Sequence, residues 1–282
     1  MQEKKLQALL NLLDDKDEVV YNAVYQELVN AGESVLPFLH EELSKKKSEL
    51  LSERIKEIID DINFDFVEKE LIKWKKNPEN TLLYGAFLIA KLQYPELEFS
   101  EIEKEINQIA DKVNLELNIY MTALQQIKVL NFRFFRNHRF KGNFLNPESK
   151  TGAFINEALK KRKANHIISA IIYISIAEQL EIDLKPVNFP HNALLALVGD
   201  EKAKDNIVFY INSFNNGLII SKSDIEIFLK KNDIKPKDEH FYICNNTVIL
   251  KEYVKFLLKI FKRDKYFNKE NYKILLNILS KK

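Results

Sequence analysis

Apolar positions in the first quarter of the chain recur with the spacing of amphipathic helices. The first predicted helix places Leu6, Leu9, Leu10 and Leu13 on one face, because they lie three and four residues apart. A second covers apolar positions from 19 to 28 and ends at Ala31-Gly32, where glycine can take the left-handed cap conformation. A third carries apolar positions from 35 to 43. We therefore expect short paired helices over residues 1 to about 77.

Asn77-Pro78 interrupts the helical pattern, because proline disfavours helix at the residue before it. The first domain boundary is predicted there. Helical spacing resumes at 81–92 and at 100–113, where Ser100 and Glu103 have the spacing of a capping box.

The pattern changes after Asp183 into short runs typical of strands. Strands are predicted at 184–188, 193–198 and 206–211, and the Asn216-Gly217 pair predicts a hairpin that joins the last of them to 218–220. Helices are expected again at 224–231, 250–261 and 269–279. The predicted fold class is α+β, with a helical segment over 1–78, a mixed domain over 79–235 and a helical extension over 236–282.

Composition and charge limit the classes of function. The chain has 282 residues, of which 46% are hydrophobic, and its formal net charge is +2. The small net charge gives no reason to expect nucleic acid or an anionic membrane as an obligatory partner. One cysteine excludes an internal disulfide, the amino terminus lacks the features of a secretory signal, and the apolar run 167–177 is too short to span a bilayer. We expect a cytoplasmic protein that binds no membrane.

Four sequence blocks have a familiar order and spacing. They read FRFFRNHRFKGNF, AFINEALKKRKANHIISAIIYISIAEQLEI, VNFPHNALLAL and FYINSFNNGLIISKSDIEIFL. Together they resemble the transglutaminase-like superfamily, and specifically its bacterial invasion-regulator (SirB-type) branch, over about residues 79–235. The resemblance implies a papain-like core in which a central helix packs on an antiparallel sheet. The N-terminal helices resemble HEAT-type repeats, which stack because one pair cannot bury its own apolar face.

The resemblance also assigns the catalytic positions of the superfamily. Active members have a cysteine at the start of the central helix, a histidine on the next strand and an aspartate on the strand after it. The helix dipole favours a thiolate, the histidine transfers protons and the acid orients the imidazole. These positions correspond here to His166, Asn192 and Asn212, and Gly152-Ala153 replaces the Asn-Ser pair typical of the branch. The nucleophile and its base are therefore absent from the expected places.

The histidines allow other readings. His191 lies one residue before the aligned position, which on a strand is the opposite face. His166 and His191 could form a two-histidine metal site, but no third ligand has a recognisable spacing. We expect His166 to line a pocket at the start of a helix, and we expect no metal and no cofactor.

Two further groups of residues have competing interpretations. Cys244 lies between aromatic and aliphatic residues, so we expect a packed side chain rather than a nucleophile. Segment 132–144 interleaves arginines with phenylalanines, a pattern that can bind nucleic acid by stacking and phosphate contact. Phe135 and Phe140 coincide with structural positions of the family, so we expect them to pack in the core instead.

The leading hypothesis is a catalytically inactive transglutaminase-like protein that binds a protein or peptide partner. His166, His191, Asn192 and Asn212 would line its degenerate cleft in binding or structural roles. One alternative is a hydrolase or amidase with His166 or His191 as base and Asn212 as orienting group. The other alternative is nucleic-acid binding through segment 132–144.

Overall fold

The chain divides into two compact units. The computed structural model describes residues 3–45, 48–77, 79–190, 192–199 and 207–281. One unit comprises Met1–Lys73 with Lys91–Glu96, and the other comprises Trp74–Ala90 with Leu97–Lys282. Each unit is described by itself below. The domain boundaries expected at 78/79 and 235/236 stay predictions.

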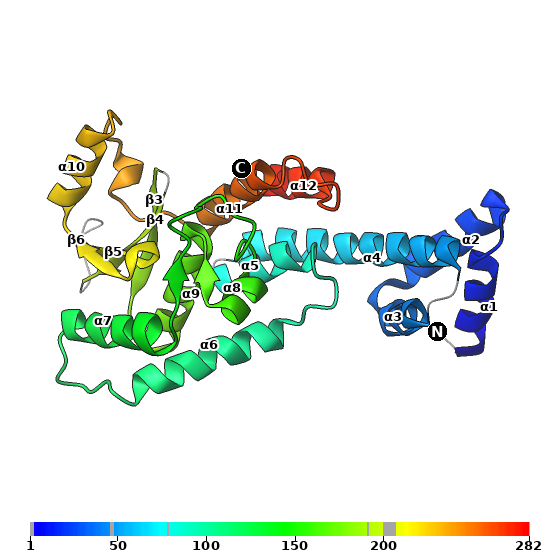
Figure 1. Cartoon of the computed structure of the whole chain (residues 1–282), viewed down its shortest axis with the longest axis horizontal. Helices are drawn as coiled ribbons and strands as arrows, with labels where there is room; N and C mark the ends of the chain where they lie inside the picture. Colours follow the sequence, from blue (N-terminus) through cyan, green and yellow to red (C-terminus); the bar gives the residue numbers. More distant parts are fainter. Residues whose placement is uncertain (1–2, 46–47, 78, 191, 200–206, 282) are drawn as a thin grey trace. The chain divides into compact units, whose positions relative to one another are not determined.

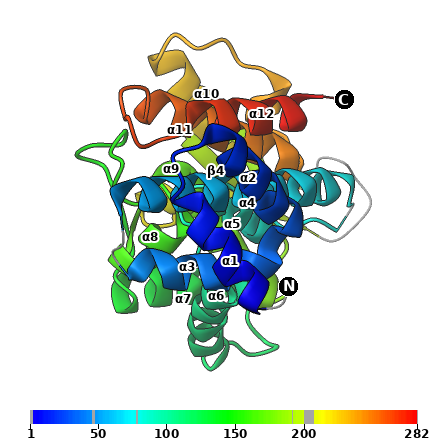
Figure 2. The same ribbon diagram turned by 90° about the vertical axis from the view of Figure 1, so that its right-hand side faces the viewer.

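The first unit is helical. It contains α1 (Glu3–Leu13), α2 (Glu18–Ala31), the 3-10 turn η1 (Gly32–Val35), α3 (Leu36–Ser44) and the first part of α4 (Glu49–Lys76). Figure 2 shows α1, α2 and α3 grouped around α4. Helix α2 ends at Gly32, as the sequence predicts, but with a φ of 62° and a ψ of −149° Gly32 has a positive-φ conformation other than the predicted left-handed helical one. The four leucines predicted on the inner face of α1 are all buried in one cluster with apolar side chains of the other three helices.

One prediction for this region was wrong. The sequence predicts only short helices up to residue 77, but α4 has 28 residues. Its apolar positions 51, 55, 58, 59 and 62 are buried against α1 to α3, so one helix supplies the long side of this core.

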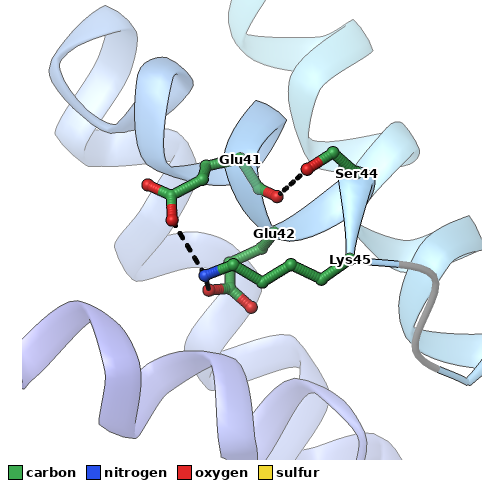
Figure 3. Close-up of polar contacts among 4 residues, drawn as sticks. All are labelled: Glu41, Glu42, Ser44 and Lys45. Atoms are coloured by element: carbon green, nitrogen blue, oxygen red, sulfur yellow. Dashed lines mark hydrogen bonds and ion pairs between the residues drawn. The ribbon is translucent and has the colours of Figure 1, made fainter.

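A glutamate is buried at the end of α3 and is matched by a lysine. Glu42 is 2% exposed, and Lys45 Nζ lies 2.6 Å from Glu42 Oε1 and 2.9 Å from Glu41 Oε1 (Figure 3). Ser44 Oγ donates to the Glu41 carbonyl at 2.6 Å. Hydrogen bonds to Glu42 and then Glu41 raise the pKa of Lys45. The pairing compensates a carboxylate that burial alone would disfavour.

The second unit begins with helices that precede the sheet. They are α5 (Leu82–Lys91), α6 (Phe99–Asn114), α7 (Ala123–Asn131), the π-helical segment η2 (Phe132–Asn137) and α8 (Ile155–Lys161). The capping box predicted from Ser100 and Glu103 is wrong, because α6 begins one residue earlier with Glu98 as an N-cap whose side chain makes no capping bond. Thr122 and Gln125 form a capping box at α7 instead.

The sheet of this unit has four antiparallel strands in the order β3-β4-β5-β6. Their bounds are Leu184–Phe189, Asn192–Val198, Ile207–Asn212 and Leu218–Ile220. The predicted hairpin is confirmed, because Asn212 pairs with Leu218 and both Asn216 and Gly217 have positive φ. A separate pair of short parallel strands joins β1 (Lys141–Gly142) to β2 (Lys163–Ala164). The α+β fold class is correct.

Helix α9 (His166–Gln179) is the centre of this unit. Every residue from Ile167 to Ala177 is buried. It packs against β3, β4 and α6 (Figure 1). Tyr173 Oη donates to Asn131 Oδ1 at 2.8 Å, and Asn131 Nδ2 donates to the Gly217 carbonyl at 2.9 Å. This chain of hydrogen bonds joins α9 to α7 and to the β5-β6 turn.

The remaining helices cover the sheet and close the unit. They are α10 (Lys222–Lys231), the turn η4 (Asp238–His240), α11 (Asn246–Ile260) and α12 (Lys269–Ser280). Ile225 and Leu229 of α10 pack with Val187, Leu194 and Tyr210 of the sheet. Helices α11 and α12 lie side by side (Figure 1). None of the helices in the described residues has both the length and the apolar character needed to span a membrane.

The Tyr173 hydroxyl gives a direct test of the central packing. Tyr173→Phe leaves Asn131 Oδ1 without its buried donor, so we expect unfolding free energy to fall by about 1–3 kcal/mol. Tyr266→Phe is the matched control, because Tyr266 is 93% exposed, and we expect a change within about 0.5 kcal/mol. Urea denaturation followed by circular dichroism measures both. Equal stability of the two variants would contradict the network.

Candidate functional site

The start of α9 is built by backbone and capping contacts around Asn165. Asn165 Oδ1 accepts from the backbone N–H groups of Ile167 and Ile168, each at 2.9 Å, which is a side-chain N-cap. The Asn165 N–H donates to the Gly152 carbonyl at 3.4 Å. Gly152 has a φ of 71°, and a Cβ there would lie 2.0 Å from the Lys163 carbonyl oxygen. Only glycine fits this close approach, which explains one of the residues that replace the Asn-Ser pair.

His166 is the first residue of α9 and lies between two aromatic rings. Its ring centroid is 5.5 Å from that of Phe256 and 6.3 Å from that of Phe214, with edge-to-face angles of 81° and 83°. Phe214 is held in turn against Gly142, where a Cβ would lie 2.4 Å from the Phe214 carbonyl oxygen. These contacts fix the imidazole at the position that the resemblance assigns to the nucleophile.

A cavity of about 240 Å³ lies beside His166. The end of β3 contributes Phe189 and the start of β4 contributes Asn192 and Ala193 to its wall, and α11 contributes further residues. The α11 side chains are Ile249, Glu252, Lys255, Phe256 and Lys259. Lys255 pairs with Glu252 at 2.7 Å, and Lys259 pairs with Glu148 at 2.5 Å. The cavity wall therefore combines apolar side chains with polar and charged ones, and both of its lysines are paired with carboxylates.

Asn192 and Asn212 share one face of the sheet. Leu195 pairs with Ile211, and side chains alternate along a strand, so Asn192 and Asn212 lie on the face that carries Leu194 and Tyr210. That face packs against α10. The other face packs against α9 and carries the buried residues Ala193, Leu195 and Ile211.

The structure brings two of the predicted site residues together and leaves one apart. His166 and Asn192 line the same cavity, and Asn192 Oδ1 is buried with no hydrogen-bond partner among the described residues. Asn212 does not line this cavity, and its Oδ1 accepts from the Asn215 N–H at 3.0 Å as the cap of a turn. His191 lies outside the described residues.

Cys244 lies far from the start of α9. Its Sγ donates to the Pro186 carbonyl at 3.4 Å, and burial raises its pKa to about 12. Cys244 lines a second cavity with Ile174 and Glu178, which are eight and twelve residues after His166 and so about 12–18 Å along the helix. A protonated thiol at this place cannot act as the nucleophile of the site.

The arginines and phenylalanines of segment 132–144 contact each other and their neighbours. Phe134 stacks on Phe140 with centroids 4.3 Å apart, and both rings are buried. Arg162 lies 5.1 Å from the Phe140 ring, and Arg133 pairs with Glu116. These contacts fit the core-packing interpretation. Phe132 and Phe144 are the exposed phenylalanines of the segment.

The described residues contain no group of three or more histidine, cysteine, aspartate or glutamate side chains placed to hold a metal ion. His166 thus contacts the rings of Phe214 and Phe256, and it shares its cavity with Phe256 and the amide of Asn192. Such an arrangement can accept or donate hydrogen bonds to a bound group. The described side chains include no thiol or hydroxyl that could attack a carbonyl there.

A sequence model described as "Transglutaminase-like superfamily" matches residues 100–255, which begin in α6 and end in α11. The chain belongs to the transglutaminase-like superfamily. The helix-on-sheet architecture around α9 and β3 to β6 is thus the superfamily core, and the cavity beside His166 lies at the amino end of its central helix.

Curated relatives of this transglutaminase-like chain are distant and cover it partly. F-box only protein 21 of Homo sapiens is 29% identical over 37% of this chain and 17% of its own length, and that of Mus musculus is 28% identical over the same shares. UPF0162 protein YchA of Escherichia coli K12 is 22% identical over 57% of this chain and 58% of its own length. The chain therefore spans less than two thirds of the relatives it matches. No solved structure matches the chain.

The cavity wall formed by α11 was missed in the sequence. Residues 249, 252, 256 and 259 lie at helical spacing on one face. This face carries both apolar and charged residues and lies beside the buried stripe of Leu250, Tyr253 and Leu257. Such a second, mixed face on a helix can be detected in the sequence. Nothing in the spacing shows that this face meets the start of α9, which lies about 80 residues earlier.

The raised pKa of Cys244 gives a labelling test. It is the only cysteine of the chain, so alkylation reports this thiol alone. With a folded pKa of about 12 against about 8.5 in the unfolded chain, we expect iodoacetamide at pH 8 to react about a thousandfold more slowly in native protein than in guanidinium chloride. Mass spectrometry follows the rate. Native labelling as fast as unfolded labelling would show that the thiol is not held as described.

Proposed function

We propose that this transglutaminase-like protein is catalytically inactive and binds a segment of another protein or a peptide in the cavity beside His166. One observation supports the proposal most directly. A cavity is present at the amino end of the central helix, and the position that the resemblance assigns to the nucleophile is occupied by His166, whose ring contacts two phenylalanine rings. Acyl transfer in this superfamily needs a thiolate there.

The cavity has the size and chemistry for a side chain of a peptide. A volume of about 240 Å³ is below the range of about 300–1,000 Å³ typical of small-molecule sites. Apolar atoms of Ile167, Phe189 and Phe256 can surround an apolar group. Asn192 lines the same cavity and its Oδ1 is buried and unpaired in the described residues, so a turn of this side chain would let it accept a hydrogen bond from a peptide N–H.

The hydrolase alternative receives less support from this geometry. It needs a base oriented by Asn212, but Asn212 caps its own turn and does not line the cavity. The nucleic-acid alternative also receives less support, because Arg133 pairs with Glu116 and the Phe134 and Phe140 rings are buried. The hydrolase alternative is an outcome of the acyl-transfer experiment below.

The finer classification is part of the same proposal. Placement in the invasion-regulator (SirB-type) branch rests on the four sequence blocks, and the paired helices α1 and α2 with α3 support a HEAT-like first unit. A single cysteine held as a thiol fits a reducing compartment such as the cytoplasm.

The absence of acyl transfer is tested with a glutamine-containing peptide and a biotinylated primary amine. We expect no amine incorporation and no ammonia release at any pH from 6 to 9, because the cavity has no thiolate. His166→Ala is the matched variant, and we expect it to give the same background. Suppose that the wild type incorporates the amine, that its rate changes with pH near neutrality, and that His166→Ala does not incorporate it. This result would support the hydrolase or transferase alternative instead.

The binding role is tested with peptides selected by display on the wild-type protein. Asn192→Arg should fill the cavity and remove its acceptor, so we expect peptide affinity to fall about tenfold or more. Asn277→Arg is the control. Asn277 is exposed on α12, so this substitution adds the same charge away from the cavity. Fluorescence anisotropy gives both affinities. Equal affinities for both variants would remove the cavity as the binding site.

A further inference from the structure

The connection between α6 and α7 exposes large apolar side chains to an unusual degree. Leu115, Ile119 and Tyr120 are 85%, 90% and 88% exposed. They lie within six positions of one another, at one end of α6 and α7 (Figure 1). Single exposed apolar residues are common, but adjoining ones mark interaction surfaces.

Helix α7 extends this surface. It buries Ile127 and Leu130 completely, whereas Leu124 is 40% exposed. Phe132, the first residue of η2 directly after α7, is 54% exposed. The pair between Glu116 and Arg133 holds the start of the connection beside the end of α7. We call Leu115, Ile119, Tyr120, Leu124 and Phe132 the apolar strip.

The strip is held in place by local hydrogen bonds. Asn118 Oδ1 accepts from the Tyr120 N–H at 3.0 Å, which turns the chain between the exposed residues. Thr122 and Gln125 then form the capping box that starts α7. The outward position of the apolar side chains is therefore built into the connection.

The charges around the strip indicate what it binds. Lys112, Lys128 and Arg136 are exposed, and none of them has an ion pair within the described part of the chain. Glu116 is already paired with Arg133, which leaves Asp111 as the nearby carboxylate outside an ion pair. An apolar strip bordered by cations complements an apolar stripe bordered by carboxylates.

We propose that the apolar strip is a second binding surface, separate from the cavity beside His166, and that it binds an acidic amphipathic helix of a partner protein. The strip is elongated along α7, which fits a helix laid along it. A second copy of this chain would bring lysines and arginines together, which repel. An anionic bilayer would attract the same cations, and the vesicle experiment below distinguishes it from a protein helix.

The probe is a synthetic amphipathic peptide of about 18 residues with leucines at i, i+3, i+4 and i+7 and glutamates along both sides. Its counterpart keeps the leucines and replaces the glutamates with lysines. We expect the glutamate peptide to bind the wild type, and Ile119→Ser with Tyr120→Ser to weaken binding about tenfold to a hundredfold. Tyr266→Ser removes an equally exposed ring elsewhere and should leave affinity unchanged.

Charge reversal distinguishes charge-specific binding at this surface from non-specific hydrophobic binding. Lys128→Glu should weaken the glutamate peptide and strengthen the lysine peptide, because it reverses the border of the strip. Circular dichroism of each variant confirms folding. Equal binding of both peptides to the wild type, or no binding of either, would overturn the proposal.

Two further arms identify the other occupants. Sedimentation velocity that shows a dimer lost in the Ile119→Ser, Tyr120→Ser variant would assign the strip to self-association. If the protein co-sediments with vesicles that contain about 30% phosphatidylserine, and the Ile119→Ser, Tyr120→Ser variant does not, the apolar strip is a membrane-binding surface. Either result, without peptide binding, overturns the protein-helix assignment. The Asn192→Arg variant should bind the glutamate peptide normally, so failure of the cavity and failure of the strip are separable.

Discussion

Burial of α9 on every side is the constraint on which the second unit depends. A helix with eleven consecutive buried residues from Ile167 to Ala177 cannot leave any face in water. The sheet covers one side, α6 covers another, and the hydroxyl of Tyr173 requires a partner, which Asn131 supplies. Because α10 covers the far face of the sheet, every layer is placed by its relation to this helix.

This constraint explains how the superfamily framework can persist with changed chemistry. The packing of α9 involves Ile167 to Ala177, whereas the position that the resemblance assigns to the nucleophile is the first residue, His166. An imidazole there makes contacts with Phe214 and Phe256 and leaves the N-cap of Asn165 intact. The resemblance assigns the nucleophile of active members to this position, and a histidine there leaves the start of the helix intact. Asn212 illustrates the same separation, because its amide serves the β5-β6 turn.

Local signals in the sequence predict much of the fold and only part of the site. The apolar run after His166, the strand-like runs around Leu195 and the Asn216-Gly217 turn are each encoded in neighbouring residues, so their elements are correctly predicted. The length of α4 and the start of α6 are not correctly predicted. Packing of five apolar positions against α1 to α3 accompanies the long α4, and the N-cap of α6 makes no side-chain hydrogen bond that would mark its start. The α11 wall of the cavity depends on contacts between distant segments, which helical spacing alone does not show. The register of β4 with β5 likewise decides which face carries Asn192.

The apolar strip differs from the other features because sequence and fold conflict there. Leu115, Ile119 and Tyr120 would gain free energy from burial, yet the Asn118 turn and the Thr122 capping box hold them outward. Foldable sequences avoid such conflicts except where a function needs them. Tyr266, an equally exposed ring in the link between α11 and α12, has no large exposed apolar neighbour among residues 260–273 and requires no such explanation. The contrast between one isolated ring and five adjoining side chains is what makes the strip a surface that needs a partner.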